Sequence, residues 1–124
     1  VLEWEPGISR RMPGLDLVIT KAGGATVHEA LSAGCPVLIS RVTPGQEEGN
    51  ARLVESQGLG WVARGDRQLA RRLAELQAGG FATLAPVRAR VEKFRRPGAA
   101  AHIARLAAAL AEGESVNGRI GRPR

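Results

Sequence analysis

The chain has 124 residues, enough for one domain with a hydrophobic core of its own. Its formal net charge is +6, yet only 3% of its residues are aromatic and none is tyrosine. A stacking platform for single-stranded nucleic acid is therefore not expected, and we predict no nucleic-acid partner. The single cysteine excludes an internal disulfide and is typical of a reducing compartment. No apolar run has the length of a membrane-spanning helix, so we expect this piece to be soluble.

The first predicted elements are two strands separated by a loop. Residues 1–4 have the pattern of a short strand. Residues 5–15 have that of a loop with a weak helical turn, which Pro13 and Gly14 interrupt. Asp16–Thr20 contains three consecutive apolar residues. Such a run is typical of a strand that is buried on both faces of a parallel sheet.

A glycine turn follows this strand and leads into a helix. Residues 21–24, Lys-Ala-Gly-Gly, end the strand, and the two glycines permit positive φ angles and a close approach of the backbone to a ligand. Thr26 begins a helical pattern, which Gly34 closes and Pro36 does not allow to continue. The unpaired N–H groups at such a helix start, together with the helix dipole, favour an anion. Residues 37–39 are then predicted to form the next buried strand.

The rest of the chain continues to alternate between helices and strands. A loop is predicted at residues 41–45, a short strand at 60–63, and helices at 47–57, 66–77, 84–94 and 99–112. Asp66 is the expected N-cap of its helix, in which Leu69, Leu73 and Leu76 form one apolar stripe. The alternation predicts an α/β fold, a Rossmann-like parallel sheet flanked by helices and joined by right-handed crossovers.

Residues 16–50 resemble a known family of enzymes. The stretch GGATVHEALSAGCP at residues 23–36, followed by PGQEEGN at residues 44–50, is similar to the donor-binding signature of GT-B-fold glycosyltransferases. The similar group contains monogalactosyldiacylglycerol synthases, processive diacylglycerol glucosyltransferases and the peptidoglycan transferase MurG. The combination of a glycine pair, Thr-x-x-Glu, Ala-Gly-x-Pro and Gln-Glu-x-x-Asn is fairly specific, whereas the glycine pair alone is a weak signal. The resemblance is densest over Asp16–Gly60.

The resemblance implies that the chain is part of a larger enzyme. In that family two Rossmann-like domains enclose the active site. We therefore interpret residues 1–112 as the carboxyl-terminal part of the nucleotide-sugar donor-binding domain, a partial carboxyl-terminal domain of a GT-B glycosyltransferase. The acceptor domain and the first strands of the donor domain are expected to be absent from this chain. Residues 113–124 show no periodicity and are predicted to be a disordered basic tail.

The implied reaction is hexosyl transfer from a UDP-sugar to a lipid acceptor such as diacylglycerol. An acceptor hydroxyl attacks the anomeric carbon with inversion, and UDP departs. The catalytic base belongs to the absent domain, so no catalytic residue is expected here and the fragment alone is expected to be inactive. That mechanism requires no cofactor and no metal, and the sequence has no Cys/His cluster for a protein-bound zinc ion.

Two groups of residues are expected to bind the nucleotide part of the donor. The resemblance implies that backbone N–H groups contact the diphosphate at Gly23, Gly24, Ala25 and Thr26. For Glu29 two interpretations stay open. Thr26-x-x-Glu29 is a capping-box pattern, whereas the resemblance implies that Glu29 accepts hydrogen bonds from both ribose hydroxyls. Lys21, just before the glycines, either approaches a phosphate or is solvated.

Further contacts are implied for the hexose and the base. By the resemblance, Gln46, Glu47 and Asn50 face the donor hexose, because amides and carboxylates suit a ring with many hydroxyls. The alternative is an ordinary helix start whose acids favour the helix dipole. Glu5, with Trp4, lies where the family places a backbone contact to the base, and a backbone contact demands no particular side chain.

The basic residues are concentrated in one segment. Residues 64–96 carry nine basic and three acidic side chains, and such a face either attracts an anionic membrane or is a solvated helix surface. With the lipid acceptor, this leads us to expect a cytoplasmic protein with peripheral contact on the inner face of the plasma membrane.

Two other functional classes fit the residues of the predicted donor site: a UDP-sugar epimerase-like enzyme on the same fold, and a non-catalytic nucleotide-binding module.

Overall fold

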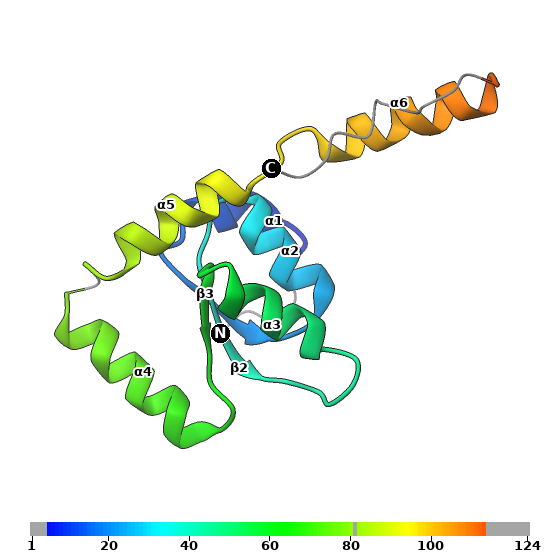
Figure 1. Ribbon diagram of the computed structural model, residues 1–124. Coiled ribbons are helices and arrows are strands. Elements are labelled where there is room, and N and C mark those ends of the chain that lie inside the picture. The colour runs from blue at the N-terminus through cyan, green and yellow to red at the C-terminus, as the bar shows by residue number, and fades with distance from the viewer. Residues whose placement is uncertain (1–4, 81, 114–124) are drawn as a thin grey trace.

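The computed structural model of this chain describes residues 5–80 and 82–113 (Figure 1). Its elements are α1 (Ile8–Arg11), a 3₁₀ turn η1 (Met12–Gly14), β1 (Val18–Lys21), α2 (Gly24–Ser32), β2 (Val37–Arg41), α3 (Glu48–Ser56), β3 (Gly60–Val62), α4 (Asp66–Ala78), α5 (Leu84–Phe94) and α6 (Ala99–Ala111). The three strands pair in parallel in the order β1-β2-β3. The predicted α/β fold is therefore confirmed. The predicted strand at residues 1–4 and the predicted tail after Gly113 lie outside the described residues.

β2 is the central strand, and its apolar residues are completely buried. Val37, Leu38 and Ile39 are each 0% exposed. In the register of the sheet, Val37 pairs with Val18 of β1 on one side and with Gly60 of β3 on the other. Side chains alternate between the two faces of a strand, so the burial of all three residues means that both faces of β2 are covered. The predicted buried strand is confirmed.

β1 differs from the prediction, because one of its faces is open. Ile19 is 50% exposed, whereas Val18 and Thr20 are half-buried. The strand also begins later than predicted and extends to Lys21. The physical reason is the face: Ile19 pairs with Leu38, so its side chain lies on the face opposite the one that α2 and α3 cover. A short apolar run does not distinguish an edge strand from a central one.

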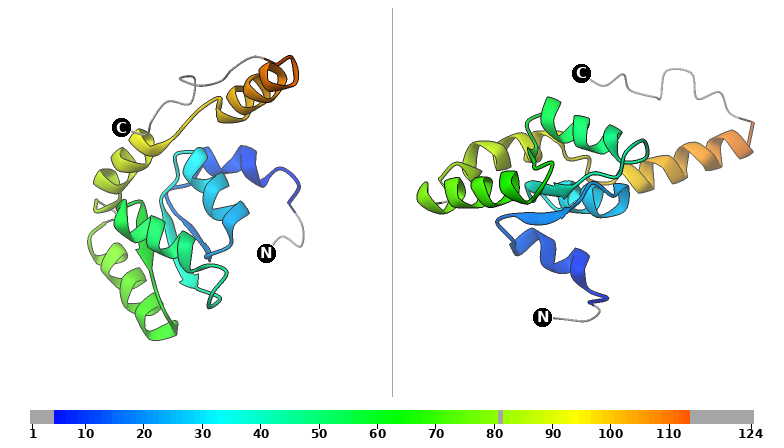
Figure 2. Two further views of the ribbon diagram at one scale, coloured as in Figure 1. Left: turned by 45° about the vertical axis from the view of Figure 1, so that its right-hand side comes forward. Right: turned by 90° about the horizontal axis from the view of Figure 1, so that it is seen from below.

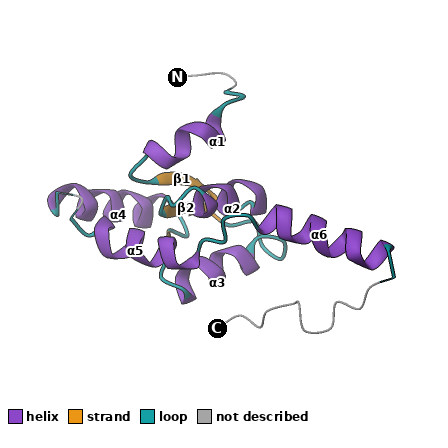
Figure 3. Ribbon diagram, turned by 90° about the horizontal axis from the view of Figure 1, so that it is seen from above, coloured by secondary structure: helices purple, strands orange, loops and turns teal. Residues whose placement is uncertain are grey.

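α2 and α3 cover the face of the sheet that Val37 and Ile39 share. The residues that the two helices bury are Val27, Ala30, Leu31, Ala51 and Val54. All of them belong to one hydrophobic cluster with Val37 and Ile39. Right-handed crossovers between parallel strands in chain order put successive helices on one face, which explains this arrangement. α1 lies beyond β1, on the side away from α3 (Figure 2, Figure 3).

β3 approaches β2 so closely that only glycine fits at one position. A Cβ built on Gly60 would overlap the backbone carbonyl of Val37 across the strand pair. Gly58, between α3 and β3, has a φ of 62°, a left-handed conformation that strains other residues. Glycine at position 58, directly after the helix predicted at residues 47–57, therefore has a conformational reason, and glycine at position 60 has a steric one.

α4 packs less completely than its apolar stripe predicts. Leu76 is 2% exposed, but Leu73 is 37% exposed. The helix begins at Asp66 itself, so the N-cap is Gly65 and the prediction that Asp66 caps the helix is wrong. No side chain caps α4, and Asp66 lies in the first turn, where its charge still favours the helix dipole.

Two arginines of α5 and Arg95, its C-cap residue, connect this helix to the amino edge of the sheet. Each donates a hydrogen bond of 2.8 Å to a backbone carbonyl: Arg88 to Leu15, Arg90 to Gly58 and Arg95 to Ser32. The three carbonyls lie in the segments that lead into β1, β3 and β2, respectively. Other arginines of residues 64–96 pair with acids, as Arg71 and Arg72 do with Glu75. Much of the basic charge in this segment is therefore engaged in contacts within the chain.

α6 extends away from the rest of the structure (Figure 1, Figure 2). Its N-cap is Gly98, whose φ of 82° turns the chain between α5 and α6. Ile103 and Leu110 of this helix are 65% and 57% exposed. Within the described ranges, no helix combines the length and the apolar character that crossing a membrane requires.

The contact between Gly60 and Val37 predicts that Gly60→Ala separates β3 from β2. We expect the variant to lose about 3 kcal/mol of unfolding free energy, because the methyl group has no room against the backbone. The matched control is Gly49→Ala within α3, where a Cβ meets nothing within 4 Å. It should be neutral or stabilise the chain by about 0.5–1 kcal/mol, since alanine favours a helix. Urea denaturation followed by circular dichroism measures both, and equal stability of the two variants would contradict the expectation.

Candidate functional site

The glycine turn lies at the carboxyl end of β1, where α2 begins. Gly23 is the N-cap of α2 with extended backbone (φ −64°, ψ 132°), and no side chain caps the helix. Neither glycine of the pair has a positive φ, so the conformational use predicted for them is wrong. The four residues predicted to contact a diphosphate, Gly23, Gly24, Ala25 and Thr26, form the N-cap and the first turn of α2.

The packing of the chain does not require glycine at this turn. A Cβ built on Gly23 or Gly24 would lie 3.5 Å from the nearest side-chain atoms, which is an ordinary contact distance. At Gly23 the nearest atoms belong to Lys21 and Glu47, and at Gly24 the nearest is the side-chain nitrogen of Asn50. The two glycines therefore leave space at the start of α2 that the fold itself does not use.

Glu29 has no capping role in the structure. Because α2 begins at Gly24, Thr26 is its third residue and is not the N-cap. The capping-box interpretation is therefore wrong. Glu29 is exposed and borders an open groove of about 500 Å³, which Ser9 and Pro13 line from the other side. A carboxylate at this place is accessible to a pair of neighbouring hydroxyls.

Glu47 is a buried acid at the start of α3. It is 6% exposed and is the N-cap of α3. The helix begins at Glu48, one residue later than predicted. Its Oε1 accepts a hydrogen bond of 2.7 Å from Lys21 Nζ, and its Oε2 accepts one of 2.9 Å from the Thr43 N–H. A buried charge without partners is costly, so these two contacts explain how the carboxylate is accommodated.

The same contacts change the acidity of Glu47. The hydrogen bond from Lys21 and, after it, that from the Thr43 N–H lower the pKa of the Glu47 carboxyl below its usual value. Burial acts in the opposite direction and is outweighed. Glu47 is therefore ionised over the whole physiological pH range, as an acceptor-only group.

Asn50 also faces the glycine turn. Its Nδ2 donates a hydrogen bond of 2.8 Å to the carbonyl of Ala22, directly before the two glycines. The carboxyl ends of parallel strands meet at one edge of a sheet, and this edge is where open α/β sheets bind ligands. The structure thus brings Glu47 and Asn50 to the turn that ends β1.

Gln46 and Glu5 are placed differently. Gln46 is exposed in the loop before α3. Glu5 accepts a hydrogen bond of 2.9 Å from the Gly7 N–H, and its other oxygen pairs with Arg11 at 3.0 Å. The Glu5 side chain therefore stabilises the turn into α1. The backbone contact of Glu5 to a base stays a prediction, and Trp4 lies outside the described residues.

Two contacts of this site, both made to Glu47, are not evident in the sequence. The sequence left two interpretations of Lys21, a phosphate contact or a solvated side chain. The structure shows a third role, an ion pair with Glu47. The two residues are 26 positions apart. Thr43 contributes its backbone N–H, which no pattern of side chains signals.

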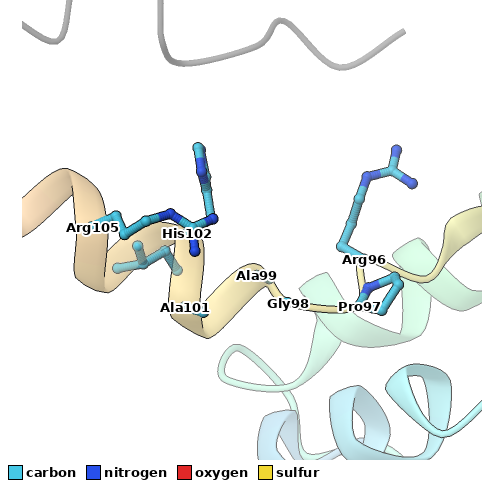
Figure 4. A pocket seen from close by; sticks show the side chains of 8 residues that line it. Arg96, Pro97, Gly98, Ala99, Ala101, His102 and Arg105 are labelled. Atoms are coloured by element: carbon cyan, nitrogen blue, oxygen red, sulfur yellow. The ribbon is translucent and has the colours of Figure 1, made fainter.

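A second hollow lies away from this edge of the sheet. It has a volume of about 470 Å³ and lies at the junction of α5 and α6, where Arg96, His102 and Arg105 border it (Figure 4). It shares no lining residue with the glycine turn. In the part of the chain that the structure describes, no group of three or more His, Cys, Asp and Glu side chains is placed to hold a metal ion.

Together, the fold and this edge define an α/β protein with a polar site where β1 and β2 end. No model of a protein family matches the chain. A probable monogalactosyldiacylglycerol synthase 2 of Oryza sativa subsp. indica is 38% identical over 71 residues, 57% of this chain and 15% of the relative. Monogalactosyldiacylglycerol synthase 3 of Arabidopsis thaliana is 36% identical over 72 residues, 58% of this chain and 16% of the relative. The processive diacylglycerol beta-glucosyltransferase of Bacillus subtilis is 36% identical over 63 residues, which are 51% of this chain and 16% of the relative.

These comparisons confirm the predicted resemblance. Over about half of its length the chain is a homologue of monogalactosyldiacylglycerol synthases and of a diacylglycerol glucosyltransferase. By their names the relatives are glycosyltransferases of diacylglycerol, and the plant enzymes are chloroplastic. The matched part spans 15 to 16% of the length of these relatives.

The lowered pKa of Glu47 predicts a pH-dependent effect of Lys21→Met. A depressed carboxyl pKa stabilises the fold above the pKa of the unfolded chain, and this contribution disappears as the pH falls through the folded value. The variant should therefore be less stable than the parent chain at pH 7. The difference should narrow as the pH falls from about 5 and vanish once Glu47 is protonated. Urea midpoints between pH 7 and 3 measure this, with the exposed Lys93→Met as control. A difference that persists in acid would contradict the assignment.

Proposed function

We propose that this chain is the donor-binding part of an enzyme that transfers a hexosyl group from a UDP-sugar to a lipid acceptor such as diacylglycerol. The observation that carries the proposal is the meeting of the start of α2 with Glu47 and Asn50 at the carboxyl edge of the sheet. It is supported by relatives that are glycosyltransferases of diacylglycerol. Open α/β sheets bind nucleotides at this edge.

The diphosphate of the donor is proposed to lie at the start of α2. The first N–H groups of a helix have no partner within the helix, and the dipole is positive there. The two glycines leave space for phosphate oxygens to approach this backbone. Lys21 lies beside this turn, but its ammonium is paired with the Glu47 carboxylate at 2.7 Å.

The ribose is proposed to bind Glu29. This acid has no role as a helix cap, and it borders the groove between α2 and the segment around Pro13. One carboxylate can accept hydrogen bonds from two vicinal hydroxyls, which is the pattern of a ribose. In the same groove the base would extend toward the loop that contains Glu5.

The hexose is proposed to lie against Gln46, Glu47 and Asn50. A carboxylate offers about four lone-pair sites, and Glu47 uses one for Lys21 and one for the Thr43 N–H. Two acceptor sites are therefore left for sugar hydroxyls. Gln46 is exposed on the same loop and can both donate and accept.

The proposed reaction inverts the anomeric carbon. A hydroxyl of the lipid attacks that carbon, and the bond to the β-phosphate oxygen of UDP breaks. The start of α2 stabilises the charge that grows on the departing diphosphate, so no metal or cofactor is required. The general base is supplied by an acceptor-binding domain outside these 124 residues, and the chain alone binds the donor without transferring it. The lipid acceptor implies peripheral contact with a membrane, on the cytoplasmic face.

The proposal predicts that the chain binds UDP, with the diphosphate and the ribose as its main contacts. We expect UDP to bind about tenfold or more tightly than uridine, with UMP between them, because the helix start favours the diphosphate charge. Isothermal titration calorimetry with the three ligands measures this. Equal, weak binding of all three would reject a diphosphate site at α2.

The ribose contact predicts that Glu29→Gln weakens UDP binding. A hydrogen bond to a charged group contributes roughly 1.5–3 kcal/mol, so a loss of about ten- to a hundredfold in affinity is expected. The melting temperature should change little, because Glu29 is exposed and caps nothing. Glu55→Gln, an exposed acid on α3, is the control and should retain UDP affinity. A large loss of stability in Glu29→Gln at unchanged UDP affinity would assign Glu29 a structural role instead.

A further inference from the structure

Two hydrogen bonds connect the loop after β2 with the turn after β1. Lys21 Nζ donates to Glu47 Oε1 at 2.7 Å, and Asn50 Nδ2 donates to the carbonyl of Ala22 at 2.8 Å. Lys21 and Ala22 precede the glycines, and Glu47 and Asn50 stand at the start of α3. The two segments that would hold the phosphate end and the hexose end of the donor are therefore connected through side chains.

The position of Glu47 depends on Lys21 more than on its own helix. Glu47 is the N-cap of α3, but its side chain makes no cap hydrogen bond to that helix. Its two oxygens are instead held by the Lys21 ammonium and by the Thr43 N–H. Without Lys21, the described polar contacts of this buried carboxylate would be reduced to those with Thr43. A carboxylate in that state either turns toward water or becomes protonated.

The burial of the two partners shows which of them is held. The Glu47 side chain is 8% exposed, whereas that of Lys21 is 66% exposed. Lys21 thus reaches from the surface to the carboxylate, with the aliphatic stem near Gly23. A lysine ammonium has three donors, and the contact with Glu47 uses one of them. Its position explains the orientation of Glu47, while Lys21 itself needs no burial to act.

We propose that Lys21 is a positioning residue for the donor sugar: it holds the Glu47 carboxylate at the glycine turn, so that the free lone pairs of Glu47 accept hydroxyls of the hexose. The inference rests on the proposed function, because it assigns a role within the same donor site. Lys21 acts through Glu47 and not as a ligand of the diphosphate. The nucleotide end depends on the backbone N–H groups at the start of α2 and on the Glu29 carboxylate. Within the described residues, the Lys21 ammonium instead donates its hydrogen bond to Glu47.

The test compares Lys21→Met, Lys21→Arg and Glu47→Gln in the full-length gene product, with diacylglycerol in mixed vesicles and UDP-glucose or UDP-galactose as donor. For Lys21→Met we expect kcat/KM for the donor to fall about tenfold or more, with both kcat and KM affected, because a misplaced hexose is bound and aligned less well. The inhibition constant of UDP should change less than about threefold, since its contacts remain. Lys21→Arg should recover most of the rate, and Lys93→Met on α5 is the surface control.

The double variant Lys21→Met/Glu47→Gln decides whether the two residues act as one unit. If Lys21 works through Glu47, the double variant is no slower than the slower single variant. A UDP inhibition constant that rises in proportion to the loss of rate would overturn the inference and make Lys21 a phosphate ligand. So would additive losses in the double variant. A parent protein that neither binds UDP nor transfers either hexose would instead reject the proposed function itself.

Discussion

Parallel pairing of β1 with β2 brings the carboxyl ends of the two strands to one edge of the sheet, and the polar groups of the chain gather there. The register aligns Lys21 with Arg41, so the turn after β1 and the loop after β2 leave the sheet side by side. The contacts of Lys21 with Glu47 and of Asn50 with Ala22 follow from that alignment, although they join residues 26 and 28 positions apart. A slip of one residue would turn the strand side chains to the other face and separate these partners.

The amino edge of the sheet is fixed by side-chain hydrogen bonds, whereas the start of α2 at the carboxyl edge has no side-chain cap. At the amino edge, α5 and its C-cap residue Arg95 donate one arginine hydrogen bond to each segment that leads into a strand. One of these bonds joins Arg95 to the carbonyl of Ser32, the last residue of α2, where the helix dipole is negative. The other end of α2, with Gly23 as N-cap, has no side-chain cap. The same helix is thus stabilised by a cation at one end and keeps its positive end available to an anion.

The buried Glu47 shows how the site is organised without a ligand. Burial alone would favour the neutral acid, but the ammonium of Lys21 and the Thr43 N–H keep the charged form. Because Lys21 is itself 66% exposed, truncating it would remove one of these two partners and leave the Thr43 N–H. Under the proposed function, a carboxylate held in this way is oriented for sugar hydroxyls, and orientation is what a transfer between two bound groups requires.

The sequence by itself determined the order and type of the described elements, because helix and strand patterns are local: the run Val37–Ile39, the glycine turn and the apolar faces of α2 and α3 are all readable from spacing. It also indicated, through residues 23–36 and 44–50, a resemblance to monogalactosyldiacylglycerol synthases and diacylglycerol glucosyltransferases, and the relatives confirm that resemblance. Only the tertiary structure decided that Ile19 lies on an open face, since this depends on which elements pack on each face of the sheet. The same holds for the start of α2 at Gly24 and for the ion pair of Lys21 with Glu47. These features depend on how segments pack in the folded chain, and the spacing of residues along the sequence does not predict that packing.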